Sequence, residues 1–514
     1  MESFDYVILG AGLGGLSAAA CLTRQGYRVA VLEQHYLPGG CCHTFSFGDY
    51  SFCADVHYIY QCGEGQILQQ FLDYIDRDVT FNSLNPDCID RIITPEVDFC
   101  IPLNWERFRD RLKVTFPEES YGIDLYCDEV KQLHDRLRQL TQEVHWYDLD
   151  WSDWLSLPKY WHLFTKRNWT LQDLYNHIGL SPKLQALLAG QSGDYGLPPS
   201  EIALLTHTSL VWDYCEGAYY PRYHFKHLVD SIVDAIVEGG GVVKYSTPVQ
   251  HIEVENDRVL NITAGAEIYQ ADNAYISDLD PKLTVKLMHN SLGLSKSEYR
   301  RLTEYEYSAS AFNIYLGLNS QFDPRSYGIG NWNIWYYPNG NLNQAYQQQL
   351  QGNLEHPWIF LSCPTLKSDE PGMCPDGHHV LEITTVCPYE PFKKLHQNSS
   401  AYKAQKRAVY QQVMNSVRDL IPDIDRYIKM KIFGTPTTSE YYLGQPKGNM
   451  YGAKLIPQQI GLNRLGYKTE LPNLYLVGAT AGYPSVPGVI SNGMDVVQML
   501  TGESIPNQQL VISR

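Results

Sequence analysis

The sequence predicts an α/β protein in which a discontinuous Rossmann-type domain carries an inserted α+β domain. Three observations support this fold class. A short apolar strand near the N-terminus runs directly into a glycine-rich turn, and a second buried strand near the C-terminus also ends in glycine. Between them, residues 249–277 alternate and turn like a β-meander, and segments such as 399–420 are typical of helices. A chain that returns at its end to its N-terminal unit predicts a discontinuous domain.

The N-terminal segment has the order of elements that binds a dinucleotide. The apolar run 6–9 is followed at once by GAGLGG at 10–15, a small-residue helix and a second apolar strand. We expect Gly10 to make the tight turn, Gly12 to let a pyrophosphate approach the backbone, and Gly15 to let helix and strand pack closely. Free N–H groups at the start of the helix attract phosphate.

Two further features decide which nucleotide is expected. Glu33 ends the second strand, where its carboxylate can accept from ribose hydroxyls and would repel a 2′-phosphate, which favours FAD or NAD over NADP. The C-terminal strand 474–478 precedes a helix that begins near 486 with Pro487 in its first turn. The N-terminus of such a helix can stabilise the negative charge of a reduced flavin. Because no second GxGxxG unit is present, the predicted cofactor is FAD.

Composition excludes several other classes of function. Hydrophobic residues make up 44% of the 514-residue chain and charged residues 19%, which is typical of a globular protein. A formal net charge of −17 disfavours nucleic acid as a partner. Twelve cysteines without a CxxC pair predict neither a disulfide framework nor a zinc site, so no metal is expected. Without a secretory signal or a long apolar run, we expect a cytoplasmic protein in a reducing compartment.

Longer blocks of the sequence resemble the retinol saturase and carotenoid isomerase branch of the phytoene desaturase-like flavoproteins. They include LEQHYLPGGCCHTFSFGDYSFCADVHYIY at 32–60, GDYGLPPSEIALLTH at 193–207, GAYYPRYHF at 217–225, DLDPKLTVKLM at 278–288 and LYLVGATAGYPSVPGVISNG at 474–493. The resemblance implies FAD, a polyene or other long isoprenoid-like substrate, and a peripheral membrane habit. The cofactor-binding residues expected from the motifs and the resemblance are Gly10, Gly12, Leu13, Gly14, Gly15, Glu33, Gln34, Gly39, Gly40, Cys41, Val249, Gly478 and Val489.

Two departures from the branch's pattern lie where its flavin ring and substrate tunnel would meet. An Asp-Thr-Gly-like step is usual where this chain has Cys53-Ala54-Asp55, and a Gly-Gly pair is usual where it has Arg222-Tyr223-His224. These departures favour a shifted substrate or reaction, so a retinoid or a carotene is not assumed.

The candidate catalytic residues are His57, Tyr58 and Asp55. Adding hydrogen across a C=C bond requires a hydride from flavin N5 and a proton from an acid, which an imidazole or a phenol can supply. The alternative is a structural hydrogen-bonding role for His57, and Asp55 would have to be protonated or paired to be buried beside a flavin. Cys41 and Cys42 are either small apolar wall residues, which we favour, or redox-active thiols.

The segment 146–169 has the composition of a membrane-contacting surface. It holds five of the ten tryptophans together with Lys159, Lys166 and Arg167, a combination that favours lipid headgroups. The alternative, supported by three aspartates in the same stretch, is a lid that packs on the rest of the protein.

These features together predict an FAD-dependent oxidoreductase that saturates or desaturates C=C bonds of a lipophilic polyene. The alternatives are a redox-neutral cis–trans isomerase that uses reduced FAD and a catalytically inactive polyene-binding flavoprotein. The expected FAD-binding domain comprises 1–100, 215–285 and 430–514, and the expected substrate domain comprises 101–214 and 286–429.

Overall fold

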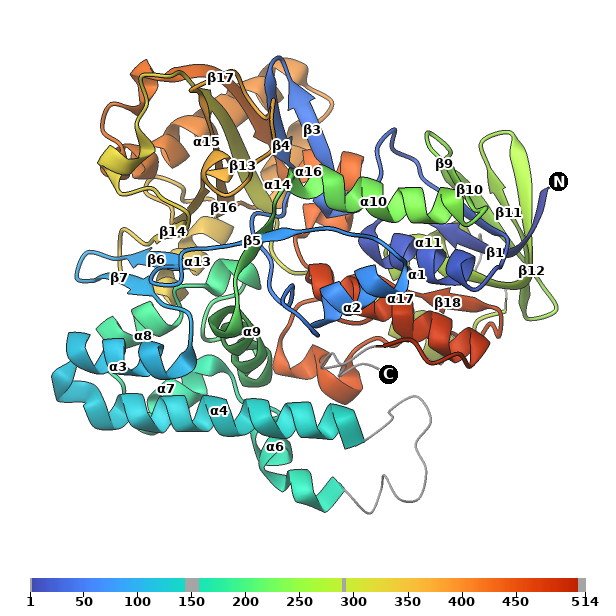
Figure 1. The fold of residues 1–514 in the computed structure, drawn as a ribbon, viewed down its shortest axis with the longest axis horizontal. Helices are drawn as coiled ribbons and strands as arrows, with labels where there is room; N and C mark the ends of the chain where they lie inside the picture. Colours follow the sequence, from blue (N-terminus) through green and yellow to red (C-terminus); the bar gives the residue numbers. More distant parts are fainter. Residues whose placement is uncertain (1, 144–156, 289–292, 507–514) are drawn as a thin grey trace.

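Two seven-stranded sheets organise the chain. The computed structural model describes residues 2–143, 157–288 and 293–506. In Figure 1 the first sheet lies beside the N-terminus and the second lies in the opposite lobe, with a group of helices beneath it.

The first sheet has a Rossmann-type parallel centre. Its order is β10-β11-β12-β1-β2-β9, with β18 also paired to β12. The pairs β12–β1, β1–β2, β2–β9 and β12–β18 are parallel, which confirms the predicted fold class. The strands are β1 (Glu2–Leu9), β2 (Val29–Leu32), β9 (Val242–Lys244), β10 (Val249–Glu255), β11 (Arg258–Ala264), β12 (Glu267–Ser277) and β18 (Leu474–Leu476).

The predicted β-meander is β10–β11–β12, whose pairs are antiparallel. Asn256 and Asp257 form its first turn with φ values of 51° and 57°. Two consecutive positive φ values favour Asn and Asp, which explains the turn residues. Helices α11 (Pro281–Leu287) and α12 (Lys296–Thr303) follow this meander.

Helices α1 (Leu13–Arg24), α10 (His224–Glu238), α17 (Val486–Thr501) and α2 (Ile67–Tyr74) gather beside the first sheet (Figure 1). Helices α1 and α17 approach closely at Gly493. A Cβ added there would lie 2.1 Å from Ser17 Oγ, 2.6 Å from the Gly14 carbonyl oxygen and 2.8 Å from the Ala18 nitrogen. This contact holds the C-terminal helix against the helix that begins at the glycine-rich turn.

We expect Gly493→Ala to destabilise the protein by about 1–3 kcal/mol, because backbone atoms of α1 would have to move. The apparent melting temperature and the retention of cofactor should both fall. Gly434→Ala is the matched control, since its Cβ would meet its nearest neighbour, Asn313 Cβ, at an ordinary 3.4 Å. Equal melting temperatures for the two variants would contradict the prediction.

The second sheet has the order β17-β13-β16-β15-β14-β6-β7, and only its β14–β6 pair is parallel. Alternate residues of a strand face opposite sides. Ile359 and Leu361 pack into the core that α15 covers, whereas Phe360 belongs to the core shared with the helical group. The strands are β6 (Asp90–Ile93), β7 (Asp98–Ile101), β13 (Ala311–Leu318), β14 (Asn333–Tyr336), β15 (Ile359–Ser362), β16 (His379–Val386) and β17 (Ile428–Gly434).

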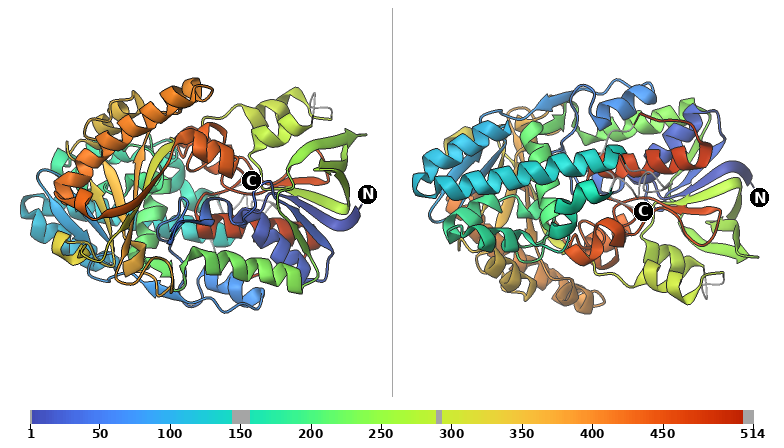
Figure 2. Two further views of the ribbon diagram at one scale, coloured as in Figure 1. Left: turned by 90° about the horizontal axis from the view of Figure 1, so that it is seen from above. Right: turned by 90° about the horizontal axis from the view of Figure 1, so that it is seen from below.

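Helix α15 (orange) packs on the second sheet, whereas α4 (cyan) lies in the helical group and contacts α3, α7 and α9 (Figure 2). The apolar segments HPWIFLSCP and HHVLEITTVCP contain β15 and β16, and the helix predicted over 399–420 is α15. The remaining helices are α3 (Trp105–Thr115), α4 (Ser120–Glu143), α6 (Trp161–Lys166), α7 (Leu171–Ile178), α8 (Pro182–Leu188), α9 (Leu204–Glu216), α13 (Leu342–Leu350), α14 (Tyr389–Leu395), α15 (Ser399–Leu420) and α16 (Pro436–Leu443). The structure also has two small two-stranded sheets. One is the hairpin of β3 (Thr44–Phe47) and β4 (Tyr50–Cys53), and the other pairs β5 (Phe81–Ser83) with the distant β8 (Tyr219–Pro221).

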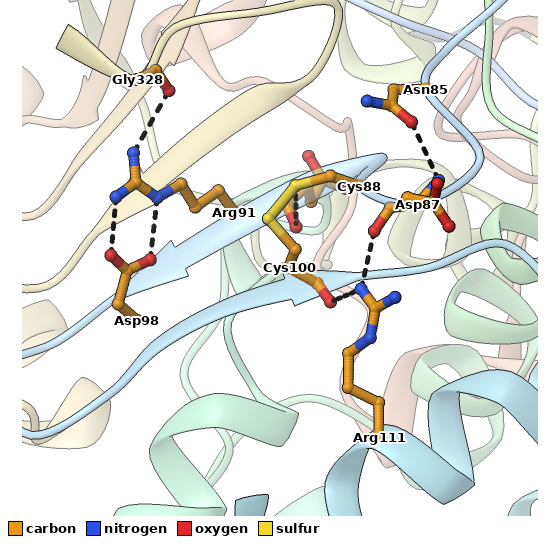
Figure 3. Close-up of a disulfide and its surroundings, with 9 residues drawn as sticks. Asn85, Asp87, Cys88, Arg91, Asp98, Cys100, Arg111 and Gly328 are labelled. Atoms are coloured by element: carbon orange, nitrogen blue, oxygen red, sulfur yellow. Dashed lines mark hydrogen bonds and ion pairs between the residues drawn. A yellow bond between two sulfur atoms is a disulfide. The ribbon is translucent and has the colours of Figure 1, made fainter.

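Strands β6 and β7 differ from expectation in two respects. They pair within the second sheet, although the sequence analysis placed 1–100 in the FAD-binding part. A disulfide, which the sequence did not predict, also joins Cys88, just before β6, to Cys100 on β7 (Figure 3). Arg91 pairs with Asp98 across the same hairpin. The division into two domains remains a proposal, with this hairpin placed on the substrate side.

The tryptophan-rich segment is described only in part. Trp146, Trp151 and Trp154 lie outside the described residues. Trp161 is 71% exposed, and Lys166 Nζ lies 3.3 Å from the ring centre of the partly buried Trp169. Within the described parts of the chain, no helix combines the length and apolar character needed to cross a membrane.

Candidate functional site

The larger cavity lies where the glycine-rich turn, the Pro38-Gly39-Gly40 segment and the C-terminal block meet. Every predicted cofactor residue except Gly15 lines it. Gly15 is buried, and its added Cβ would lie 2.5 Å from the Gly10 carbonyl oxygen and 3.1 Å from Ile8. Gly15 therefore permits close packing of helix and strand, the role that its place in the motif predicts.

The glycine-rich turn and the second glycine pair form one cradle. Gly39 N donates to the Ala11 carbonyl at 2.7 Å, and Gly12 and Gly39 form a parallel bridge. Gly39 and Gly40 have φ values of 109° and 57°, which glycine adopts without strain. A Cβ on Gly40 would lie 3.2 Å from Gly12 Cα. The backbone of both segments is thus open to a bound pyrophosphate.

Glu33 is held at the wall of this cavity by two backbone donors. Ala11 N donates to Oε2 and His35 N donates to Oε1, each at 2.7 Å. A carboxylate oxygen can accept more than one hydrogen bond, so both oxygens keep capacity for ribose hydroxyls.

Asp278 also lines this cavity, although the sequence motifs did not identify it as a cofactor-binding residue. It follows β12, and its carboxyl lies against the turn: an added Cβ on Gly12 would be 2.4 Å from Asp278 Oδ2. Burial raises the pKa of Asp278 to about 7, the Gly15 amide opposes the rise, and the charge of Glu33 adds to it. An acid at the phosphate end of a dinucleotide site makes the affinity for the nucleotide depend on whether the acid is protonated.

The C-terminal block contributes the other end of the cavity. Gly478 and Val489 line it, as does Ser485, whose hydroxyl caps α17 by accepting from Gly488 N at 3.1 Å. The cavity therefore runs from the N-terminal glycines to the start of α17. This extent fits an elongated dinucleotide whose ring system ends near a helix N-terminus.

A second cavity adjoins the first and is walled mainly by aromatic and aliphatic side chains. Both cavities are lined by Asp55, Val56, His57, Asp194, Tyr451, Pro484, Ser485 and Val486. The second continues along α9 past Leu205 and Leu210. All three candidate catalytic residues line the second cavity, which we call the chamber. The larger cavity and the chamber therefore meet at titratable groups.

Asp55 lies at this junction. Its Oδ1 accepts from Asn313 Nδ2 at 2.7 Å. Burial raises the pKa of Asp55 to about 6, while His57 and the Asn313 hydrogen bond oppose the rise. The pairing that the sequence analysis required for a buried acid is therefore present.

His57 is anchored by a residue far away in the sequence. Its Nδ1 lies 2.7 Å from Glu382 Oε2, and its Nε2 lies 3.4 Å from Thr384 Oγ1. Glu382 is fully buried and also accepts from Cys53 N at 3.0 Å. The carboxylate fixes the imidazole orientation, with Nε2 directed toward the cavity residue Thr384.

Both adjacent cysteines line the larger cavity, and they differ in exposure. Cys41 lines the cavity, and Gln445 Nε2 lies 2.8 Å from its sulfur. Burial raises the pKa of the Cys41 thiol, which favours the protonated form over a reactive thiolate. Cys42 is buried. These surroundings favour the wall role, which remains a prediction.

The second departure from the branch's pattern lies away from both cavities. Arg222 pairs with Asp369 at 2.9 Å, Tyr223 is 39% exposed, and His224 is buried against Thr44. Neither these residues nor Tyr219 and Tyr220 line the two cavities. The expectation that this departure lies beside the tunnel stays a prediction, which the lining of these two cavities does not support.

The parallel sheet, glycine cradle and elongated cavity define a dinucleotide-binding oxidoreductase fold. Residues 8–75 match the family model of the NAD(P)-binding Rossmann-like domain. An oxidoreductase from Methanosarcina mazei covers 97% of this chain and 100% of its own at 17% identity and a TM-score of 0.64. Putrescine oxidase bound to putrescine covers 98% and 100% at 13% identity and a TM-score of 0.62.

Proteins with similar sequences indicate a narrower group within the dinucleotide-binding oxidoreductases. The all-trans-retinol 13,14-reductase of Danio rerio is 27% identical over 506 residues, 93% of this chain and 82% of that protein. The chloroplastic prolycopene isomerase of Daucus carota is 23% identical, with 93% and 76% covered. An inactive all-trans-retinol 13,14-reductase of Danio rerio is 21% identical, with 94% and 83% covered. These relatives confirm the resemblance to the retinol saturase and carotenoid isomerase branch.

Proposed function

We propose that this protein is an FAD-dependent oxidoreductase that saturates or desaturates C=C bonds of a long apolar polyene. The observation that carries the proposal is the junction of the two cavities. A dinucleotide cradle opens at Asp55 and His57 into a chamber with apolar walls. An extended hydrocarbon chain suits such walls, and its double bond would lie beside the cofactor.

The chain's own residues bind, orient and supply protons. The glycine cradle and Glu33 would hold the phosphates and ribose of FAD, and the N-terminus of α17 would stabilise negative charge on its ring system. Bound FAD supplies or accepts a hydride. His57, Asp55 and Tyr58 are the candidate proton-transfer residues, and the aromatic walls keep bulk water from the reacting bond.

Two alternatives follow from the relatives. A prolycopene isomerase is among them, so cis–trans isomerisation with reduced FAD is the second candidate reaction. An inactive reductase is also among them, so binding without turnover is a distinct class of function. A glycine cradle that opens into an apolar chamber is compatible with oxidoreduction, with isomerisation and with binding without turnover.

The proposal is tested by anaerobic incubation of the purified protein with all-trans-retinol and, separately, with prolycopene. Oxidised samples and samples reduced with dithionite are followed by flavin absorbance and product mass. We expect a gain or loss of two hydrogens together with reoxidation or reduction of the flavin. An isomer of unchanged mass formed only by the reduced protein would establish the second candidate.

Two outcomes would contradict enzymatic function on these compounds. Binding of either polyene without spectral change or product indicates the inactive class. Failure to retain or to take up FAD would overturn the cofactor assignment and the proposal with it.

A further inference from the structure

A single hydroxyl joins two carboxyl groups beside the chamber, the fully buried Asp90 and the half-buried Asp194. The Tyr58 hydroxyl lies 2.5 Å from Asp194 Oδ2 and 3.1 Å from Asp90 Oδ2. A phenol has one hydrogen to donate, so it satisfies one carboxylate only. The other short contact requires a proton on the second carboxyl. Two carboxyl groups that share one donor therefore hold an extra proton between them.

Asp90 is the member of the pair that is built to be ionised. It is fully buried on β6. Gln191 Nε2 donates to its Oδ2 at 2.7 Å, and Asn333 Nδ2 and Trp335 Nε1 each donate to its Oδ1 at 3.1 Å. Burial raises the pKa of Asp90, but these donors and the positive charge of the buried Lys367 oppose the rise. Such a set of donors stabilises the charged form.

Asp194 lacks comparable support, so of the two carboxyl groups it is the one that favours the protonated form. Among the described residues, Tyr58 is its hydrogen-bond partner. Burial raises the pKa of Asp194 well above its usual range, and the negative charge of Asp90 adds to the rise. In the resulting arrangement Tyr58 donates to Asp90, and the Asp194 carboxylic acid donates to the Tyr58 oxygen.

The position of Asp194 makes this proton available to a substrate. Asp194 lines both cavities. It ends the short helical turn Ser192–Asp194, which is packed rigidly: a Cβ on Gly193 would lie 2.1 Å from the Trp335 ring, and Tyr451 Oη donates to the Gly193 carbonyl at 2.9 Å. The acid is thus fixed at the junction of cradle and chamber.

We propose that Asp194, in place of the three candidates named from the sequence, is the catalytic proton donor of this site, and that Tyr58 and Asp90 act as positioning residues that keep it protonated. This inference rests on the proposed polyene chemistry. In a reduction, one carbon of the double bond accepts a hydride from reduced flavin, and the other carbon accepts the Asp194 proton. The O–H bond breaks as the C–H bond forms, and the Asp194 carboxylate takes up a proton from water. In a desaturation, the hydride and the proton move in the opposite directions, to the flavin and to the Asp194 carboxylate. In an isomerisation, the proton that a carbon accepts from Asp194 afterwards returns to Asp194.

The first test is Asp194→Asn, measured as the flavin-loaded protein. We expect kcat to fall about 100-fold or more, since general acids contribute about 10²–10⁴-fold, while flavin retention is unchanged. Asp213→Asn is the matched control: Asp213 is buried on α9, accepts from Gln61 at 3.0 Å and lines neither cavity. Wild-type turnover in Asp194→Asn, or an equal loss in Asp213→Asn, would overturn the assignment.

The second test detects the proton without turnover. Infrared difference spectra at neutral pH between wild type and Asp194→Asn should contain the C=O band of a protonated carboxyl. Tyr58→Phe should shift this band without loss of flavin, because the acid loses its hydrogen-bond partner. Absence of the band overturns the inference whatever the activity. The band together with an absence of turnover on any polyene would instead refute the proposed function and leave the proton assignment intact.

Discussion

Replacing Glu382 by alanine is expected to lower the free energy of unfolding by about 3–5 kcal/mol, because it breaks a buried, hydrogen-bonded pair. Glu382 is fully buried on β16, and its two oxygens accept from His57 and from Cys53 N. Without the carboxylate, the Cys53 N–H loses its partner and the imidazole of His57 loses its orientation. Thermal or denaturant unfolding of the FAD-saturated protein measures the loss.

Two variants control for this prediction. Glu382→Gln keeps the side-chain volume and one accepting oxygen, so its cost should be smaller. Asp230→Asn removes an exposed partner of Lys226 on α10 and should cost less than about 1 kcal/mol. A Glu382→Ala protein as stable as Asp230→Asn would show that the buried pair does not anchor the β4 region to the second sheet.

The affinity for FAD is expected to fall about tenfold for each pH unit above 7, and to change little below it. The Asp278 carboxyl, whose pKa burial raises to about 7, lies against the glycine-rich turn that we propose as the pyrophosphate site. A bound anion favours the neutral acid, so binding takes up a proton once Asp278 is ionised in the free protein. Below pH 7 the acid is already protonated, and no proton is taken up.

Quenching of FAD fluorescence, titrated between about pH 6 and pH 8.5, measures this dependence. Asp278→Asn should bind FAD with an affinity that is nearly constant over the range and higher than that of the wild type at the alkaline end. Asp272→Asn, at an exposed position on β12, should keep the wild-type dependence. An unchanged slope in Asp278→Asn would assign the proton uptake to another group.

Several elements could be predicted because their signals are local. The strand–glycine–helix order at 6–24, the Asn256-Asp257 turn, and the helix over 399–420 each depend on neighbours a few residues apart. Most of the proposed cofactor residues could be named from the sequence for the same reason, since a glycine-rich turn and its flanking strands occupy one continuous stretch. Val249, Gly478 and Val489 needed the family resemblance, and the structure places them on the same cavity.

Only the tertiary structure shows which residues hydrogen-bond to the candidate catalytic residues. Tyr58 meets Asp194 across 136 positions, and His57 meets Glu382 across 325. The β6–β7 hairpin leaves the N-terminal part to pair with β14, bringing Asp90 under Tyr58. No period or spacing encodes such contacts, because they arise from how two sheets pack against shared helices. The sequence by itself determined the Rossmann-type fold and its nucleotide-binding turn. Tertiary packing determined which acids lie beside the substrate chamber and which of them keeps a proton, because burial and shared donors exist only in the folded chain.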